Sequence, residues 1–556
     1  MRVRPRSVVV RAGICEPRAM RRILALTLAA WLVPGEADAF CGFFVGHAGS
    51  TLSNRATSVV LVRDGTRTVL SMRNDYTGPP EDFAMIVPVP VVLRSADVKT
   101  LPHAIFERLE RTTAPRLVEY WEADPCSEET RGMRPAGTTG AESKYVIDGA
   151  SVNAPDGGSV RVLSRFEVGE YDVEVLGARD SLGLARWLQD HGYKLPPGLD
   201  GALRPYVQAG MKFFAAKVAI SRVRRDAPGR ATLSPLRFHY DSDAFSLPIR
   251  LGLLSSDGVQ DLVVHVIARD RYQAANRANV AIPTNLDVAD AALSAFPQFY
   301  AALFDRAVAA SPGAVVTEYA WSMIQKCDPC TAPSPDREML ATLGGDVLWN
   351  PEHGPPMPLA VNHTPTGNVS VEGDDPFQPT AERAEREAAR RRVPGKPWRW
   401  PEELVLTRLH LRYGAADVGE DLVLQAAEPI AGGDERWGAL DPGFRVAAHN
   451  KFQARYAVRH RWTGPVKCFY PRHGVWSGQP GTRPAVATDL AFVPRDANLA
   501  TFLAGELAPA EALAPAARRP RPAVAPQPTP TGCARCDVGP GGSLALLLLL
   551  RRRRRR

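Results

Sequence analysis

The sequence predicts an α+β fold with strand-rich antiparallel sheets, interspersed helices, a disordered or low-complexity insertion and a C-terminal spacer. Three observations lead to this class. Short segments with strand periodicity dominate the first 330 residues and return after residue 400. Helical periodicity occurs only in isolated stretches between them. The strict alternation of strands and helices that a doubly wound parallel sheet requires is missing from the pattern.

The strand assignments rest on apolar runs, alternation and turn residues. Residues 58–63 and 66–72 flank Asp64-Gly65, which suits the two positive-φ positions of a type I′ turn and predicts a hairpin. Residues 83–89 are continuously apolar and predict a buried strand. The other expected strands are residues 171–175, which alternate, residues 250–254 and 262–267, which flank Ser256-Asp257-Gly258 as a hairpin candidate, and residues 403–413.

Two segments carry helical signals. Asp180 or Ser181 caps a stretch in which apolar side chains recur at helical spacing, and Gly192 follows it as a stop signal. Residues 288–309 form a second helical stretch, which Pro297 is expected to kink or split.

Composition divides the chain into seven parts. Residues 1–19 are Arg-rich and precede Met20, which we expect to be the true initiator. The expected parts are residues 1–19 as an upstream extension, 20–39 as a signal peptide, 40–330 as an α+β globular region, 331–400 as a Pro/Gly/charge-rich insertion, 401–505 as a strand-rich continuation of the globular region, 506–531 as an Ala/Pro-rich spacer and 532–556 as a sorting tail.

The segment from Met20 predicts export. A charged start, the apolar stretch 23–33 and the small-x-small sequence 37–39 together are typical of a signal peptide. The apolar stretch is shorter than the roughly 20 residues of a spanning helix. The formal net charge of +8 belongs to the ends, because residues 1–39 carry +4 and Arg551 to Arg556 carry +6. The remainder is therefore slightly acidic, and nucleic-acid binding loses its main support.

The C-terminal part of the chain contains Thr531-Gly532-Cys533, the glycine-rich stretch 539–542, the Leu-rich run 544–550 and the terminal Arg block. This arrangement resembles the MYXO-CTERM sorting signal of exported myxobacterial proteins. It implies that sorting machinery in the membrane or at the cell surface cleaves the chain near Gly532 and Cys533. The protein would then be attached to the cell surface or outer membrane through Cys533, with Cys536 as the alternative cysteine. A low-complexity tail without a sorting role is the other interpretation.

Five cysteines lie in the exported body, and an export route permits disulfides. The spacing of Cys327 and Cys330 fits half of a zinc site or a redox-active pair, but no second ligand pair is present and prolines follow, which indicates a loop. We therefore expect a structural disulfide that involves this pair, and at least one cysteine outside intramolecular pairs because the number is odd. The candidates are Cys41, Cys126, Cys327, Cys330 and Cys468.

One cluster combines residue types that bind metals. His239, Asp241 and Asp243 would share one face of a strand, and their oxygen and nitrogen atoms suit a divalent cation. The same pattern also fits the polar, solvated face of a half-buried strand, and this second interpretation is the one we favour. The three residues are thus weak metal candidates, and no cofactor is expected.

Two histidines in other predicted strands have structural explanations. His410 alternates with apolar residues beside Arg408 and Arg412, which predicts a basic outer face rather than a catalytic group. His265 lies in an apolar strand and is expected to be a core or interface histidine. The sequence contains no nucleophile elbow, zinc-protease motif, P-loop or dinucleotide-binding fingerprint.

Several stretches of the chain share a common family pattern: residues 40–45, 59–72, 78–85 with Pro88 and Pro90, 117–122, 238–242, 318–321 with Cys327 and Cys330, and 462–465. Together they resemble an exported bacterial family, the domain of unknown function 2330, over most of residues 40–480. That resemblance implies no established activity, substrate or catalytic residue.

Two functional hypotheses follow. The first is a non-enzymatic, exported and surface-anchored structural or binding protein, which the sorting signals, the spacer and the motif search favour. The second is an exported hydrolase or metal-dependent enzyme that uses the face carrying His239, Asp241 and Asp243. We expect the sorting machinery as a partner and no nucleic acid.

Overall fold

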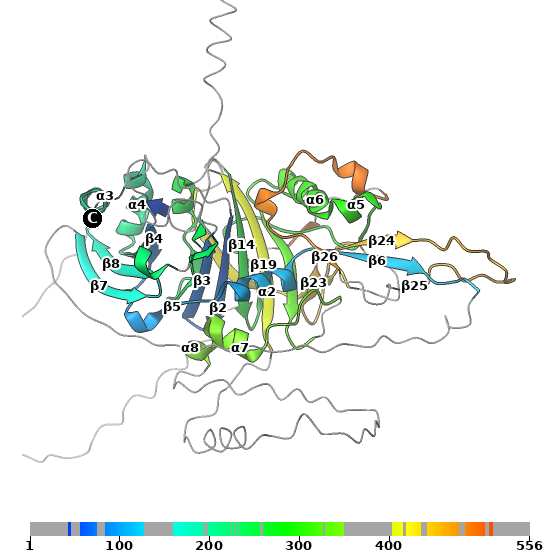
Figure 1. The fold of residues 1–556 in the computed structure, drawn as a ribbon, viewed down its shortest axis with the longest axis horizontal. Coiled ribbons are helices and arrows are strands. Elements are labelled where there is room, and N and C mark those ends of the chain that lie inside the picture. Colours follow the sequence, from blue (N-terminus) through cyan, green and yellow to red (C-terminus); the bar gives the residue numbers. More distant parts are fainter. Residues whose placement is uncertain are drawn as a thin grey trace, which may run out of the picture. The chain divides into compact units, whose positions relative to one another are not determined.

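A computed structural model of the chain shows a strand-rich α+β fold, which confirms this part of the predicted class, although the sheets are mixed rather than purely antiparallel (Figure 1). The chain divides into two units, Met1–Ala516 and Ala517–Arg556, and all described residues lie in the first. Among them, no helix has both the length and the apolar character needed to cross a membrane. The structure describes residues 43–45, 56–74, 84–126, 160–349 and 403–514, the last two ranges with short gaps.

A large mixed sheet of 12 strands organises the described part of the chain. Its central strands combine one parallel pair, β2 with β14, with antiparallel neighbours. In spatial order the main path is β22 (Arg445–Val446), β21 (Ile430–Gly432), β23 (Lys451–Gln453), β18 (Val315–Ser322), β19 (Val405–Gly414), β14 (Val259–Ala268), β2 (Ala56–Asp64), β3 (Arg67–Asn74), β12 (Leu236–Asp241) and β5 (Val98–Thr100), and β16 (Asn279–Ala281) and β27 (Glu511–Ala512) join beside β18.

Four smaller sheets complete the strands that the structure describes. One is an antiparallel sheet of β1 (Phe43–Val45), β4 (Ala84–Val89), β9 (Lys212–Val218), β8 (Tyr171–Ala178) and β7 (Val160–Val168). Another contains β17 (Leu286–Asp287), β24 (Arg455–His460), β6 (Arg116–Glu122), β25 (Trp476–Ser477) and β26 (Ala485–Val486). The remaining sheets comprise β13 (Ser246–Leu247), β20 (Leu422–Ala427) and β15 (Arg271–Ala274), and the pair β10 (Arg225–Ala227) and β11 (Arg230–Ala231).

Helices cover the sheets and connect them. The α-helices are α2 (His103–Thr113), α3 (Ser181–Asp190), α4 (Leu199–Gln208), α5 (Ala291–Ser294), α6 (Phe296–Ala310), α7 (Arg337–Leu340) and α8 (Asp346–Leu348). Shorter turns are η2 (Ser95–Asp97), η4 (Ile220–Arg222), η5 (Arg250–Ser255), the π-helical η6 (Ala341–Gly345), η7 (Leu490–Phe492) and η8 (Leu499–Phe502).

The core is layered. Apolar side chains of β4, β8 and β9 pack against one face of the large sheet, where the rings of Phe214 and Phe238 meet with centroids 5.4 Å apart. Helices α3 and α4 cover the other side of this smaller sheet. The opposite face of the large sheet packs against α2, α6 and α7. Charged residues on that second face are consequently enclosed between strands and helices.

Several predicted elements are confirmed. The hairpin of β2 and β3 is present, but Asp64 pairs with Arg67, so Gly65 is the first of two turn residues. Gly65 alone has a positive φ there, +58°, which fits a type II′ rather than the expected type I′ turn. The buried strand β4, the alternating strand β8 and the strand β19 also form as expected.

Both predicted helices form. The Asp180 side chain caps α3 by accepting a hydrogen bond from the Gly183 backbone. The second helical stretch is split at Ala295, and Pro297 lies in the first turn of α6, where its missing N–H leaves no helical bond unmade. Gly192, the expected stop residue, lies outside the described residues.

The predicted hairpin around residues 256–258 is wrong. Residues 250–255 form the 3₁₀ turn η5, and β14 pairs with β19 and β2 instead. Strand β14 therefore pairs with segments that are distant in sequence and not with the residues directly before it.

Part of the expected insertion packs onto the large sheet. Residues 337–348 form α7, η6 and α8, and Met339, Leu340 and Leu343 join the core beside α2. Residues 350–402 lie outside the described residues.

Candidate functional site

A row of charged side chains lies over one face of β19. This charged row comprises Arg408, His410 and Arg412 of the strand, together with Arg495 and the carboxylates of Glu110, Asp261, Asp305 and Glu318. Arg408, His410 and Arg412 alternate with apolar residues that point into the core between the two sheets. The prediction of a basic outer face is wrong, because Arg408 and His410 are each only 1% exposed. Side chains of α2 and α6 contact these residues, and carboxylates of neighbouring strands surround them.

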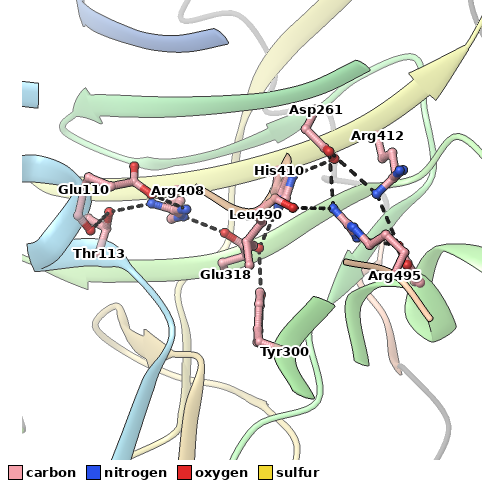
Figure 2. Close-up of polar contacts among 11 residues, drawn as sticks. Glu110, Thr113, Asp261, Tyr300, Glu318, Arg408, His410, Arg412, Leu490 and Arg495 are labelled. Carbon is pink, nitrogen blue, oxygen red and sulfur yellow. Dashed lines mark hydrogen bonds and ion pairs between the residues drawn. The ribbon is translucent and has the colours of Figure 1, made fainter. Parts of the chain in front are cut away.

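Arg408 lies between two buried carboxylates, as Figure 2 shows. Its Nε donates to Glu318 Oε2 at 2.5 Å, and Nη2 donates to Glu110 Oε1 at 2.8 Å. Nη1 donates to the Thr113 hydroxyl at 3.3 Å. The guanidinium therefore ties helix α2 to strands β18 and β19 through charge-assisted hydrogen bonds.

His410 lies between two carboxylates as well (Figure 2). Its Nδ1 is 2.9 Å from Glu318 Oε1, and its Nε2 is 3.2 Å from Asp261 Oδ1. Helix α6 closes the site, because Phe304 stacks on the imidazole with ring centroids 4.1 Å apart, and the Tyr300 hydroxyl donates to Glu318 Oε1 at 2.6 Å. Both nitrogens of the ring thus face an acceptor.

The row continues to a partly exposed rim. Arg495 donates to Asp261 Oδ2 at 3.3 Å and to Asp305 Oδ1 at 2.7 Å. Arg412 lies 3.6 Å from Asp261 and 3.5 Å from Asp305. The rim balances the charge of Asp261, which is itself buried.

Mutual pairing shifts the titration of these groups. Burial alone opposes ionisation of Glu318, but the charges of His410 and Arg408 outweigh it and lower the pKa of Glu318 to about 2. Burial likewise opposes protonation of His410, yet Glu318 and Asp261 raise the pKa of His410 above its ordinary value. With His410 protonated, positive and negative groups alternate along the row, which is the arrangement that stabilises buried charges.

His265 lies beside the row and confirms the prediction of a core histidine. It is 1% exposed, and its Nε2 is 2.9 Å from the Thr113 hydroxyl. Its Nδ1 is buried without a hydrogen-bond partner among the described residues. Burial, and next the charge of Arg408, lower the pKa of His265 to about 3, so the ring is neutral in the folded protein.

These shifts predict a loss of stability in acid. Because the folded pKa of His265 lies below its ordinary 6.5, the unfolded state binds more protons as the pH falls below 6.5. This group should remove about 2 kcal/mol of unfolding free energy between pH 6.5 and pH 5. Glu318 adds a loss as the pH falls from 4.5 towards 2. His410 acts oppositely, since its contribution is complete below 6.5 and disappears as the pH rises through its raised pKa.

Urea unfolding at about pH 7 and about pH 5 measures this effect. His265→Gln should lose less stability than the wild type over that interval, whereas His449→Gln, at an exposed histidine, should behave as the wild type does. An equal acid loss in the His265→Gln protein would contradict the assignment.

The weak metal candidates have separate partners. Asp241 forms an ion pair with Arg67 at 2.8 Å, and His239 Nε2 lies 3.3 Å from Asp97. The backbone oxygen of Asp243 accepts from Arg63 at 3.5 Å. Within the described ranges, no group of three or more His, Cys, Asp and Glu side chains is arranged to hold a metal ion.

One disulfide has both of its cysteines among the described residues. Cys126 and Cys468, 342 residues apart in sequence, are bonded and join the segment after β6 to the loop after β24. Cys330 is also disulfide-bonded. Cys41 and Cys327 lie outside the described residues, as do Gly532, Cys533 and Cys536.

The acidic members of the row were not among the candidates drawn from the sequence. Glu318 is a single acid within the otherwise uncharged strand Val315–Ser322, and Asp261 begins the apolar part of β14. A lone acid in such a strand is a usable signal, because a buried carboxylate requires a cationic or hydrogen-bonding partner. Glu110 offers no such signal, since it lies in an amphipathic helix among other charges.

No curated protein and no solved structure matches the chain. The model of a family described as "Uncharacterized protein conserved in bacteria (DUF2330)" matches residues 35–425, which include most of the charged row and more than half of the chain. The chain therefore belongs to the DUF2330 family.

Proposed function

We propose that this chain is a non-enzymatic structural or binding protein that is exported and anchored at the cell surface. The observation that carries the non-enzymatic part is the closed pairing of His410, whose two ring nitrogens both face carboxylate oxygens. A general base needs an unprotonated nitrogen within reach of a substrate proton. With Glu318 and Asp261 as its partners, the imidazolium instead donates two hydrogen bonds within the fold.

The other polar groups of the row support the same interpretation. The Tyr300 hydroxyl is committed to Glu318, and Arg408 is committed to Glu318 and Glu110. Such groups join α2, α6, β14, β18 and β19 into one unit. They favour a rigid scaffold over a site that exchanges protons with a substrate.

The bonded cysteines support export. Cys126 and Cys468 are far apart in sequence, and disulfides of this kind persist mainly in oxidising compartments. The signal-peptide pattern and the Ala/Pro-rich spacer before the tail are consistent with a body that is held away from a membrane.

Removal of the anchoring cysteine tests the proposed attachment. Cys533→Ala should release most of the protein from the cell surface into the medium, whereas Cys536→Ala should leave it attached. Intact mass spectrometry of the surface protein should show a chain without Arg551 to Arg556. Exported protein that retains its complete C-terminus would contradict the sorting role.

A further inference from the structure

The loop of residues 461–475 combines positive charge with exposed aromatic side chains. It follows β24, which runs parallel to β6, so both strands end at the same edge of their sheet (Figure 1). The loop contains Arg461, Lys467 and Arg472, all exposed, and no Asp or Glu. Its charge is thus of one sign, although the body as a whole is nearly neutral.

Two neighbouring aromatic residues form the most exposed apolar feature of the loop. Phe469 is 90% exposed and Tyr470 is 83% exposed, and their rings contact each other edge to face with centroids 5.1 Å apart. Val466 is 45% exposed in the same loop. Large aromatic side chains are rarely left this accessible without a partner, so the patch indicates an interaction site.

The loop is fastened to β6 and cannot easily fold its aromatic residues inward. The Trp462 and Gly474 backbone N–H groups donate to the two oxygens of Glu122 at 3.0 and 2.7 Å, and Arg472 N donates to Pro125 O at 2.9 Å. The Cys126–Cys468 disulfide fixes the residue just before Phe469. A loop that is already ordered loses little conformational entropy on binding.

We propose that the 461–475 loop docks on the surface of an anionic lipid bilayer. Phe469 and Tyr470 would enter the headgroup region, where aromatic rings with a polar end are favoured. Lys467 and Arg472 lie within three residues of this pair and would face the lipid phosphates. Alternation of aromatic and cationic side chains is the chemistry that such an interface selects.

A lipid surface fits this patch better than a second protein chain does. A stable protein interface buries about 800 Å² on each partner. Two aromatic side chains contribute about 150 to 250 Å² each. A bilayer needs no complementary shape, and it gains from every cation that comes within the screening length of its surface.

Vesicle binding of the full chain tests the proposal. Binding to vesicles of phosphatidylglycerol and phosphatidylcholine should exceed binding to pure phosphatidylcholine. Phe469→Ala/Tyr470→Ala should weaken binding to the anionic vesicles at least ~10-fold. Lys467→Gln and Arg472→Gln should each weaken it about 5-fold at low salt. Hydrogen exchange in peptides that cover residues 461–475 should slow only with anionic vesicles.

Matched variants control for the rest of the chain. Phe492→Ala and Arg186→Gln remove an exposed aromatic residue and an exposed cation outside the loop and should leave binding unchanged. Cys533→Ala should also bind normally, so failure of the anchoring proposal would not affect this result. Unchanged vesicle binding of Phe469→Ala/Tyr470→Ala would overturn the lipid proposal. Concentration-dependent dimers of the wild type that this variant abolishes would overturn it in favour of a second copy.

Discussion

Replacement of Arg408 by methionine is expected to lower the free energy of unfolding by about 3 to 5 kcal/mol. The variant removes the cation that lies between Glu110 and Glu318 and leaves two carboxylates buried without it. Methionine occupies a similar volume, so the loss reports the charge rather than a cavity. Urea unfolding with an unchanged m-value measures the effect.

A surface ion pair supplies the matched control for Arg408. Arg67 pairs with Asp241 at 2.8 Å, but their side chains are 40% and 54% exposed. Arg67→Met should therefore change stability by less than about 1 kcal/mol. Adding Glu110→Gln to Arg408→Met should recover part of the loss, because one unpaired charge disappears. Equal effects of Arg408→Met and Arg67→Met would show that the buried row does not stabilise the fold.

Loss of the Cys126–Cys468 disulfide is expected to remove about 2 to 5 kcal/mol of stability. The bond closes a loop of more than 300 residues, since its cysteines are 342 positions apart. In the chain-entropy description, a closure of this length restricts the unfolded state more than a short one does. The double variant Cys126→Ala/Cys468→Ala should therefore unfold at lower urea concentration.

Hydrogen exchange in the same double variant distinguishes a local effect of the disulfide from a general loss of stability. Hydrogen exchange should rise first in residues 461–475, which lose their covalent link to the segment after β6 and keep only hydrogen bonds to it. Strand β14, in the centre of the large sheet, should remain protected under native conditions. Unchanged exchange in the loop, together with unchanged unfolding, would contradict the role given to the disulfide.

Patterns among neighbouring residues were sufficient to predict several strands and helices. Strands β2 and β3 follow from the Asp64-Gly65 turn between their two segments, and α3 follows from its Asp180 cap. The split before α6 follows from Pro297. In each case the residues that decide the structure lie within a few positions of one another.

The order of strands in the sheets depends on pairing between distant segments, which the sequence does not reveal. Strand β2 pairs in parallel with β14, about 200 residues later, and β24 pairs in parallel with β6 across more than 300. The prediction of a strand over residues 250–254 is wrong, because this short apolar stretch has no helical or strand period of its own and forms the turn Arg250–Ser255.

For the charged row, too, the sequence predicts which side chains share a face but not what covers that face. Alternation correctly separates Arg408, His410 and Arg412 from the apolar face of β19. It cannot say that Glu110 of α2 and Tyr300 of α6 cover the charged face, since these residues come from distant segments. Burial of this face converts an expected solvated surface into an internal network.

The central claim is that His410 is held as a doubly donating imidazolium within a closed structural network. NMR of the protein with isotope-labelled histidine, with His410→Gln to assign the signal, measures the protonation of both ring nitrogens directly. We predict that both carry a proton at about pH 6 and that the titration midpoint lies above 6.5. A ring with one unprotonated nitrogen and a midpoint at or below 6.5 would contradict the claim, because that nitrogen would be free to act as a base.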